Sequence, residues 1–127
     1  RLGTREIEEA VSSHPAVAEA AVIGVHDEVK GQVPVVFTTI RQQGDGHSNA
    51  EIADQMLQAV TRQLGAVARP AKVYVVNALP KTRSGKLLRR SLQALAEDRD
   101  PGDLSTLDDP GALEDARRAI AEGRETG

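Results

Sequence analysis

The sequence predicts an α+β fold, in which a small sheet of about three strands has helices packed on its faces. Short apolar runs rich in β-branched residues alternate with longer amphipathic segments. Their order along the chain is helix, strand, strand, helix, strand, helix, helix. The chain has 127 residues, of which 39% are hydrophobic, which suits one domain with a modest core.

The first part of the chain contains a predicted helix and two predicted strands. Thr4 is expected to cap the helix, which ends before Pro15. Residues 20–25 form a short apolar run typical of a buried strand, and residues 33–40 are rich in β-branched side chains. We expect these strands to pair as a hairpin, with Pro34 placing the start of the second strand at an edge.

Local capping signals define the next helix. Ser48 and Glu51 have the spacing of a capping box, and Gly65 stands where a C-terminal cap belongs. Between them, one helical face carries only apolar side chains: Ile52, Met56, Ala59, Val60 and Leu64. An amphipathic helix over this stretch is therefore predicted.

The second half of the chain contains a predicted third strand and two further helices. Valines mark the strand over residues 73–76, and a helical apolar pattern runs from about residue 87 to residue 97. The dipeptide Asp109-Pro110 is typical of a helix cap followed by the first helical residue. The last helix is expected to begin there.

The chain changes in charge after its predicted sheet. From residue 97 onward there are ten Asp or Glu residues against four Arg residues. We therefore distinguish residues 1–97 from an acidic C-terminal extension over residues 98–127, which carries the terminal helix and belongs to the same domain. Because the chain opens on Arg1 without a methionine, inside patterned sequence, we expect it to be a piece of a longer protein.

Composition excludes several classes of function. The chain has no cysteine, which excludes disulfides, thiolate metal sites and a cysteine nucleophile and fits a cytoplasmic location. His14, His26 and His47 have no partner at metal-ligand spacing, so no metal site is predicted. No run is long enough to span a membrane, and no membrane association is expected.

The strongest functional signal is the basic segment LPKTRSGKLLRR over residues 79–90. It holds five cations and no acid, within a chain whose formal net charge is −3. The cations are Lys81, Arg83, Lys86, Arg89 and Arg90. Gly85 has no side chain and lets the backbone approach a ligand closely.

We expect a helix to begin near Lys86, with Ser84 as its cap, so that a lysine stands at a positive helix end. This arrangement favours a phosphate or another polyanion, although a solvated basic turn stays open as an alternative. The segment is not a Walker A loop, because Pro80 and Leu87 replace a required glycine and a required Ser or Thr.

These residues resemble the C-terminal lysine motif of acetyl- and propionyl-CoA synthetases, which are adenylate-forming acyl-CoA synthetases. Two further stretches are similar to conserved blocks of that family: RLGTREIE at residues 1–8, after the interdomain hinge, and HPAVAEAAVIG at residues 14–24. The resemblance extends to about Ile120. Residues 69–71 and 98–110 are most similar to the propionate-activating branch, and the acetate-activating branch is next.

The resemblance implies a two-step reaction and roles for particular residues. ATP and a short carboxylate, propionate or acetate, would give an acyl-adenylate and pyrophosphate, and CoA would then give acyl-CoA and AMP. Lys86 would enter the active site for adenylation only, beside the backbone of Gly85. Arg1 would contact ATP phosphates, and Arg62, next to Thr61 at the family's CoA-binding position, would contact CoA. Mg²⁺ would accompany ATP outside this chain.

The resemblance also implies partners. The chain would be the mobile C-terminal domain of a ligase, inactive without the N-terminal adenylation domain. In bacterial relatives the corresponding lysine is reversibly acetylated, which implies a lysine acetyltransferase and deacetylase acting on Lys86.

Two other classes of function stay open beside the enzyme. In one, the chain is a non-catalytic interaction module whose basic loop docks an acidic partner or a modifying enzyme. In the other, the five cations bind nucleic acid. An acidic chain with only two aromatic residues argues against the second, and no nucleic-acid partner is expected.

Overall fold

The computed structural model describes residues 3–41 and 48–122. In chain order the elements are α1 (Thr4–Ser12), β1 (Val17–Asp27), β2 (Gly31–Ile40), α2 (Asn49–Leu64), the short 3₁₀ helix η1 (Ala66–Ala68), β3 (Lys72–Val75), α3 (Arg89–Ala96) and α4 (Pro110–Glu122). This order confirms the α+β class and the predicted sequence of elements. No helix in the described ranges is both long and apolar enough to cross a bilayer.

The sheet has the strand order β1-β2-β3. Strands β1 and β2 form the predicted antiparallel hairpin, whereas β3 runs parallel to β2. A parallel neighbour requires a crossover connection, and α2 supplies it. Pairing with β3 begins at Val35, and just before it the Ala71 N–H donates to the Pro34 carbonyl at 2.8 Å. Residues 31–33 of β2 pair with β1 and have no partner in β3, so the start of β2 lies at an edge, as predicted.

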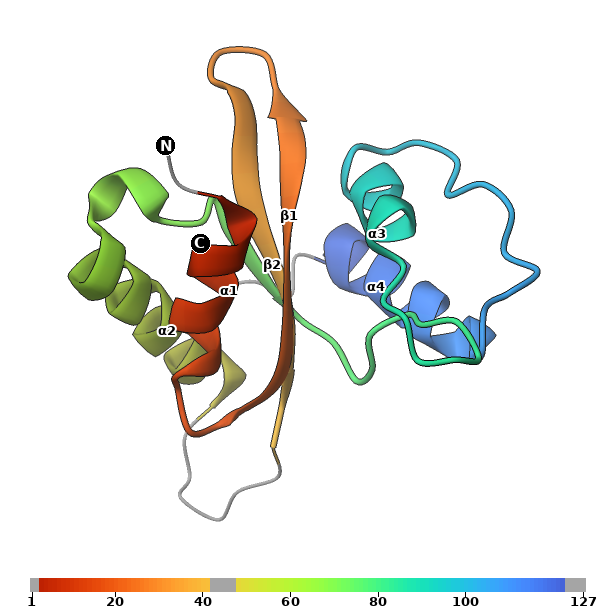
Figure 1. Cartoon of the computed structure of the whole chain (residues 1–127), viewed down its shortest axis with the longest axis horizontal. Helices are drawn as coiled ribbons and strands as arrows, with labels where there is room; N and C mark the ends of the chain where they lie inside the picture. Colours follow the sequence, from red (N-terminus) through yellow and green to blue (C-terminus); the bar gives the residue numbers. More distant parts are fainter. Residues whose placement is uncertain (1–2, 42–47, 123–127) are drawn as a thin grey trace.

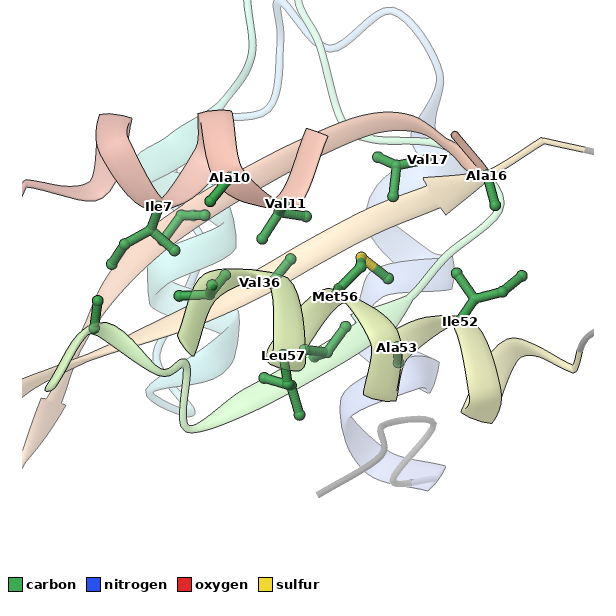
Figure 2. Close-up of a cluster of buried hydrophobic side chains, with 14 residues drawn as sticks. Ile7, Ala10, Val11, Ala16, Val17, Val36, Ile52, Ala53, Met56 and Leu57 are labelled. Atoms are coloured by element: carbon green, nitrogen blue, oxygen red, sulfur yellow. The ribbon is translucent and has the colours of Figure 1, made fainter. Parts of the chain in front are cut away.

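Helices cover both faces of the sheet, with α1 and α2 on one side and α3 and α4 on the other (Figure 1). Because side chains alternate across a strand, adjacent residues of β2 enter different cores. Val36 joins Val11 and Met56 in the cluster under α1 and α2, which Figure 2 shows in detail. Burial on both faces explains why the strands appear in the sequence as continuous apolar runs.

The second cluster lies between the sheet and the helices α3 and α4. Phe37 of β2 faces Tyr74 of β3 within it, with ring centroids 5.2 Å apart. Leu92 of α3 and Leu113 of α4 pack into the same cluster. The residues after position 97 thus contribute side chains to a core that they share with the sheet.

Helix boundaries follow local capping chemistry. Ser48 Oγ accepts the Glu51 N–H at 3.1 Å while Glu51 Oε1 accepts the Ser48 N–H at 2.9 Å, which confirms the capping box. Gly65 has the positive φ of 92° that a glycine cap permits. The prediction of Thr4 as an N-cap was wrong by one position, because Gly3 precedes the helix and donates its N–H to Glu6 Oε1 at 3.1 Å.

A carboxylate at the end of α3 ties that helix to the hairpin. Glu97 Oε2 accepts the backbone N–H of His26 at 2.8 Å, and Glu97 Oε1 pairs with Arg99 at 2.7 Å. The hydrogen bond from His26 and then those from Arg99 lower the pKa of Glu97 below its ordinary value of 4.5. The ionised form is therefore the one that the fold stabilises.

Replacing Leu92 by alanine should lower the free energy of unfolding by about 2–5 kcal/mol, because its fully buried side chain would leave a cavity. Arg90→Ala, on the exposed face of the same helix, should change it by less than about 0.5 kcal/mol. Urea unfolding of both variants measures this difference. Equal effects would place Leu92 outside the core.

Glu97→Gln should destabilise the chain most at neutral pH. A carboxyl with a lowered pKa contributes stability above its unfolded value and loses it as the pH falls through the folded value. The difference in unfolding free energy between the two proteins should therefore shrink below about pH 4.5. Urea titrations between pH 7 and the acid range test this, and a difference independent of pH would contradict it.

Candidate active site

The basic segment begins where the chain leaves the sheet. Leu79 and Pro80 are buried next to β3, and they fix the start of the loop. The chain then crosses to the side of the sheet that carries α3 and α4 (Figure 1). Lys81 and Leu87 form an antiparallel bridge, and the Leu88 N–H donates to the Pro80 carbonyl at 3.0 Å. The residues between them therefore form a closed loop.

Thr82 closes the turn that carries the predicted lysine. Its N–H donates to the Lys86 carbonyl at 2.8 Å, and its Oγ1 accepts the Lys86 N–H at 3.1 Å. Its own carbonyl accepts the Gly85 N–H at 2.8 Å. Gly85 has a φ of 90°, a conformation that side chains rarely adopt, so the turn requires glycine there. The sequence predicted a different reason for glycine at position 85, namely close approach of the backbone to a ligand.

Lys86 does not lie at a helix start, and that prediction was wrong. Helix α3 begins at Arg89, three residues later, because Leu87 is held in the bridge to Lys81 and cannot adopt helical geometry. Leu88 precedes the helix without a side-chain cap. Ser84 also does not cap the helix, since its hydroxyl lies 3.0 Å from Thr82 Oγ1. The closed turn, rather than a helix end, orients Lys86.

Two of the five cations are neutralised by acids from the first two elements. Lys81 Nζ pairs with Glu19 of β1. Arg89 makes two bonds to the Glu8 carboxylate of α1, at 2.6 and 3.1 Å, and those bonds raise the pKa of Arg89. Sequence reasoning missed both acids, because an acid far away in the chain gives no local signal that it will pair.

Lys86 is the cation on this turn that has no partner among the described residues. Its side chain is exposed and forms no ion pair or hydrogen bond with any residue in the described ranges. Arg83 instead donates to the Ser105 carbonyl at 3.3 Å. Arg90 is exposed and also lacks a partner among the described residues, but it lies on α3 rather than on the turn. An unpaired ammonium on an ordered turn can neutralise an anion or stabilise a developing negative charge.

Of the other predicted site residues, Gly85 lies on this turn and Arg62 does not. Arg62 is exposed in the last turn of α2, on the opposite side of the sheet from α3 and α4 (Figure 1). Arg1 lies outside the described residues. Within residues 3–41 and 48–122, no group of three His, Asp or Glu side chains could hold a metal ion.

Known proteins with similar sequences are acyl-CoA ligases. The chain is 53% identical to a propionate–CoA ligase of Escherichia coli over 126 residues, covering 96% of this chain and 20% of the relative. It is 48% identical to an acetyl-coenzyme A synthetase of Pyrobaculum aerophilum over 122 residues, covering 96% of this chain and 18% of the relative. The chain thus spans about a fifth of the length of these relatives.

Solved structures with a similar fold include two CoA synthetases. An acyl-CoA synthetase from Brucella canis matches with a TM-score of 0.62 and 37% identity, covering 72% of this chain and 16% of that one. An acetoacetyl-CoA synthetase from Streptomyces lividans matches in fold with a TM-score of 0.71 and 21% identity, covering 97% of this chain and 18% of that one. Residues 6–86 match the family described as the AMP-binding enzyme C-terminal domain, and the chain belongs to that family.

Proposed function

We propose that this chain is the C-terminal domain of an ATP-dependent short-chain acyl-CoA ligase, and that Lys86 serves its adenylation half-reaction. The observation that carries the proposal is the ammonium of Lys86, which is exposed, has no partner among the described residues and lies on a hydrogen-bonded turn in a member of this family. Because the relatives are about five times longer, the remaining parts of the active site belong to an N-terminal adenylation domain. The isolated chain is therefore expected to be inactive.

The chemistry of adenylation explains why a lysine is needed. A carboxylate oxygen attacks the α-phosphorus of ATP, the bond to pyrophosphate breaks, and negative charge builds up on the phosphate oxygens. A preorganised cation at that point typically contributes roughly 3–4 kcal/mol to the transition state. In the second step the CoA thiol attacks the acyl carbon and AMP leaves, and Lys86 has no role there. ATP and CoA are the cosubstrates.

The Mg²⁺ ion that accompanies ATP is, in this proposal, bound outside this chain. CoA contact by Arg62 and ATP contact by Arg1 stay as proposals, each supported only by the resemblance of the sequence.

Propionate is the substrate that the comparisons favour, with acetate as the alternative. Propionate–CoA ligases of Escherichia coli and Salmonella typhimurium are each 53% identical to the chain, and the acetyl-coenzyme A synthetase of Pyrobaculum aerophilum is 48% identical. A cytoplasmic location is part of the proposal, because cells hold ATP and CoA pools in that compartment.

We also propose Lys86 as a site of reversible acetylation. Its exposure and the absence of a described partner support this, because a lysine acetyltransferase or deacetylase needs a free side chain. Acetylation removes the positive charge and would abolish the electrostatic contribution to adenylation.

In the intact ligase, Lys86→Ala should slow formation of acyl-adenylate by roughly 10²- to 10³-fold, the effect of removing one preorganised donor. The rate of acyl-CoA formation from supplied acyl-adenylate and CoA should not change. Pyrophosphate release measures the first half-reaction, and acyl-CoA formation measures the second. An equal fall in both rates would contradict the assigned role.

Arg90→Ala is the matched control, since it removes another exposed cation without a described partner from the same segment. It should leave both half-reactions unchanged. If Lys86→Ala spared adenylation but abolished binding to an acidic protein, the domain would instead be a docking module.

Ligase carrying acetyl-lysine at position 86 should reproduce the defect of Lys86→Ala, and treatment with a deacetylase should restore pyrophosphate release. The physical reason is loss of the same charge while the aliphatic stem is retained. Full adenylation activity of homogeneously acetylated enzyme would disprove both the role of the charge and the regulatory proposal.

A further inference from the structure

We propose that the acidic extension acts as a strap that positions the Lys86 turn for adenylation. The strap is residues 104–108 together with Asp115 of α4, and it holds the loop at two places. This inference rests on the proposed function, because it concerns how the same lysine is held. The family match ends at residue 86 and gives the strap no role.

The first attachment lies where the chain leaves β3. Asp115 is only 5% exposed, and its carboxylate accepts the Asn77 backbone N–H at 2.6 Å and the Asn77 side-chain amide at 3.2 Å. A buried carboxylate is tolerated only when its oxygens are hydrogen-bonded, so this contact is specific. It fixes both the backbone and the side chain of Asn77, shortly before the loop begins.

The second attachment runs along the loop itself. Leu107 forms an antiparallel bridge with Thr82, and the Asp108 N–H donates to the Lys81 carbonyl at 2.9 Å. One residue further along the loop, Arg83 donates to the Ser105 carbonyl at 3.3 Å. The strap therefore contacts three consecutive loop residues, Lys81 and Thr82 through their backbone and Arg83 through its side chain.

An apolar anchor and a turn hold the strap in place. Leu107 is 6% exposed and Leu104 is half-buried, and both pack on the second core cluster. Asp103 accepts the Ser105 N–H at 2.9 Å, which closes the turn from which the Ser105 carbonyl meets Arg83. The strap is thus bound through its own side chains to the core on which the loop also packs.

The consequence for Lys86 follows through Thr82. Thr82 bonds to both the N–H and the carbonyl of Lys86, and it lies opposite Leu107 in the antiparallel bridge, where the Asp108 N–H donates to the Lys81 carbonyl next to Thr82. Releasing the strap would free the loop backbone beside Thr82, while the core under α1 and α2, which contains no strap residue, would stay intact. A misplacement of about 1 Å at a reacting group can cost on the order of 10² in rate. Adenylation should therefore depend on the strap, and thioester formation should not.

The test uses the intact ligase with Asp115→Asn and Leu107→Ala. An asparagine at position 115 presents one oxygen in place of two, and alanine at position 107 removes the apolar anchor. Each change should lower the rate of acyl-adenylate formation by roughly tenfold or more, with acyl-CoA formation from supplied acyl-adenylate unchanged. Glu114→Gln, at the exposed position next to Asp115, is the matched control that should change neither rate. If Leu107→Ala fails to fold, the same two rates are measured in the milder variant Leu107→Val.

A double variant separates positioning from simple destabilisation. If the strap acts through Lys86, Asp115→Asn should cause no further loss of adenylation in a protein that already carries Lys86→Ala. A multiplicative loss, or equal losses in both half-reactions, would overturn the inference. If Lys86→Ala is selective for adenylation and the strap variants are not, the inference alone fails. If Lys86→Ala itself spares adenylation, the proposed function fails.

Discussion

The presentation of Lys86 depends on the hydrogen bonds that Thr82 makes to both backbone groups of that residue. These bonds close a turn in which glycine supplies the required positive φ. Around it, Lys81 and Arg89 are bound to acids of β1 and α1, so their charges are compensated. Exposed ion pairs contribute little to stability. Here the ion pairs matter because they compensate Lys81 and Arg89 but not Lys86, whose charge has no counterion in the described part of the chain.

The two-sided sheet makes this arrangement possible in a small domain. One core, under α1 and α2, holds the hairpin and the crossover helix without any part of the basic loop. The other core takes in Leu79 and Leu107, which lie on the two chain segments that meet at the turn. The loop can therefore be ordered by one core while the lysine side chain remains in solvent. The role proposed for Lys86 needs this combination of an ordered backbone and an exposed side-chain ammonium.

Local features of the sequence were predictable, and long-range ones were not. The capping box and glycine cap of α2 are formed by residues close in sequence, and the apolar runs identified the strands. The parallel pairing of β3 depends on a crossover that no local pattern encodes. The helix start was placed too early because the bridge at Leu87 involves tertiary contacts. Glu8 and Glu19 lie 81 and 62 residues from their basic partners, beyond the reach of any spacing rule.

The most direct test of this account is trace labelling of the folded chain with an amine-reactive reagent, followed by mass spectrometry of each lysine. The account predicts rapid modification of Lys86 and protection of Lys81, and predicts that Glu19→Gln removes the protection of Lys81 without changing Lys86. Equal protection of Lys86 and Lys81 in the folded protein would show that the lysine on the turn is not free, and would contradict the account.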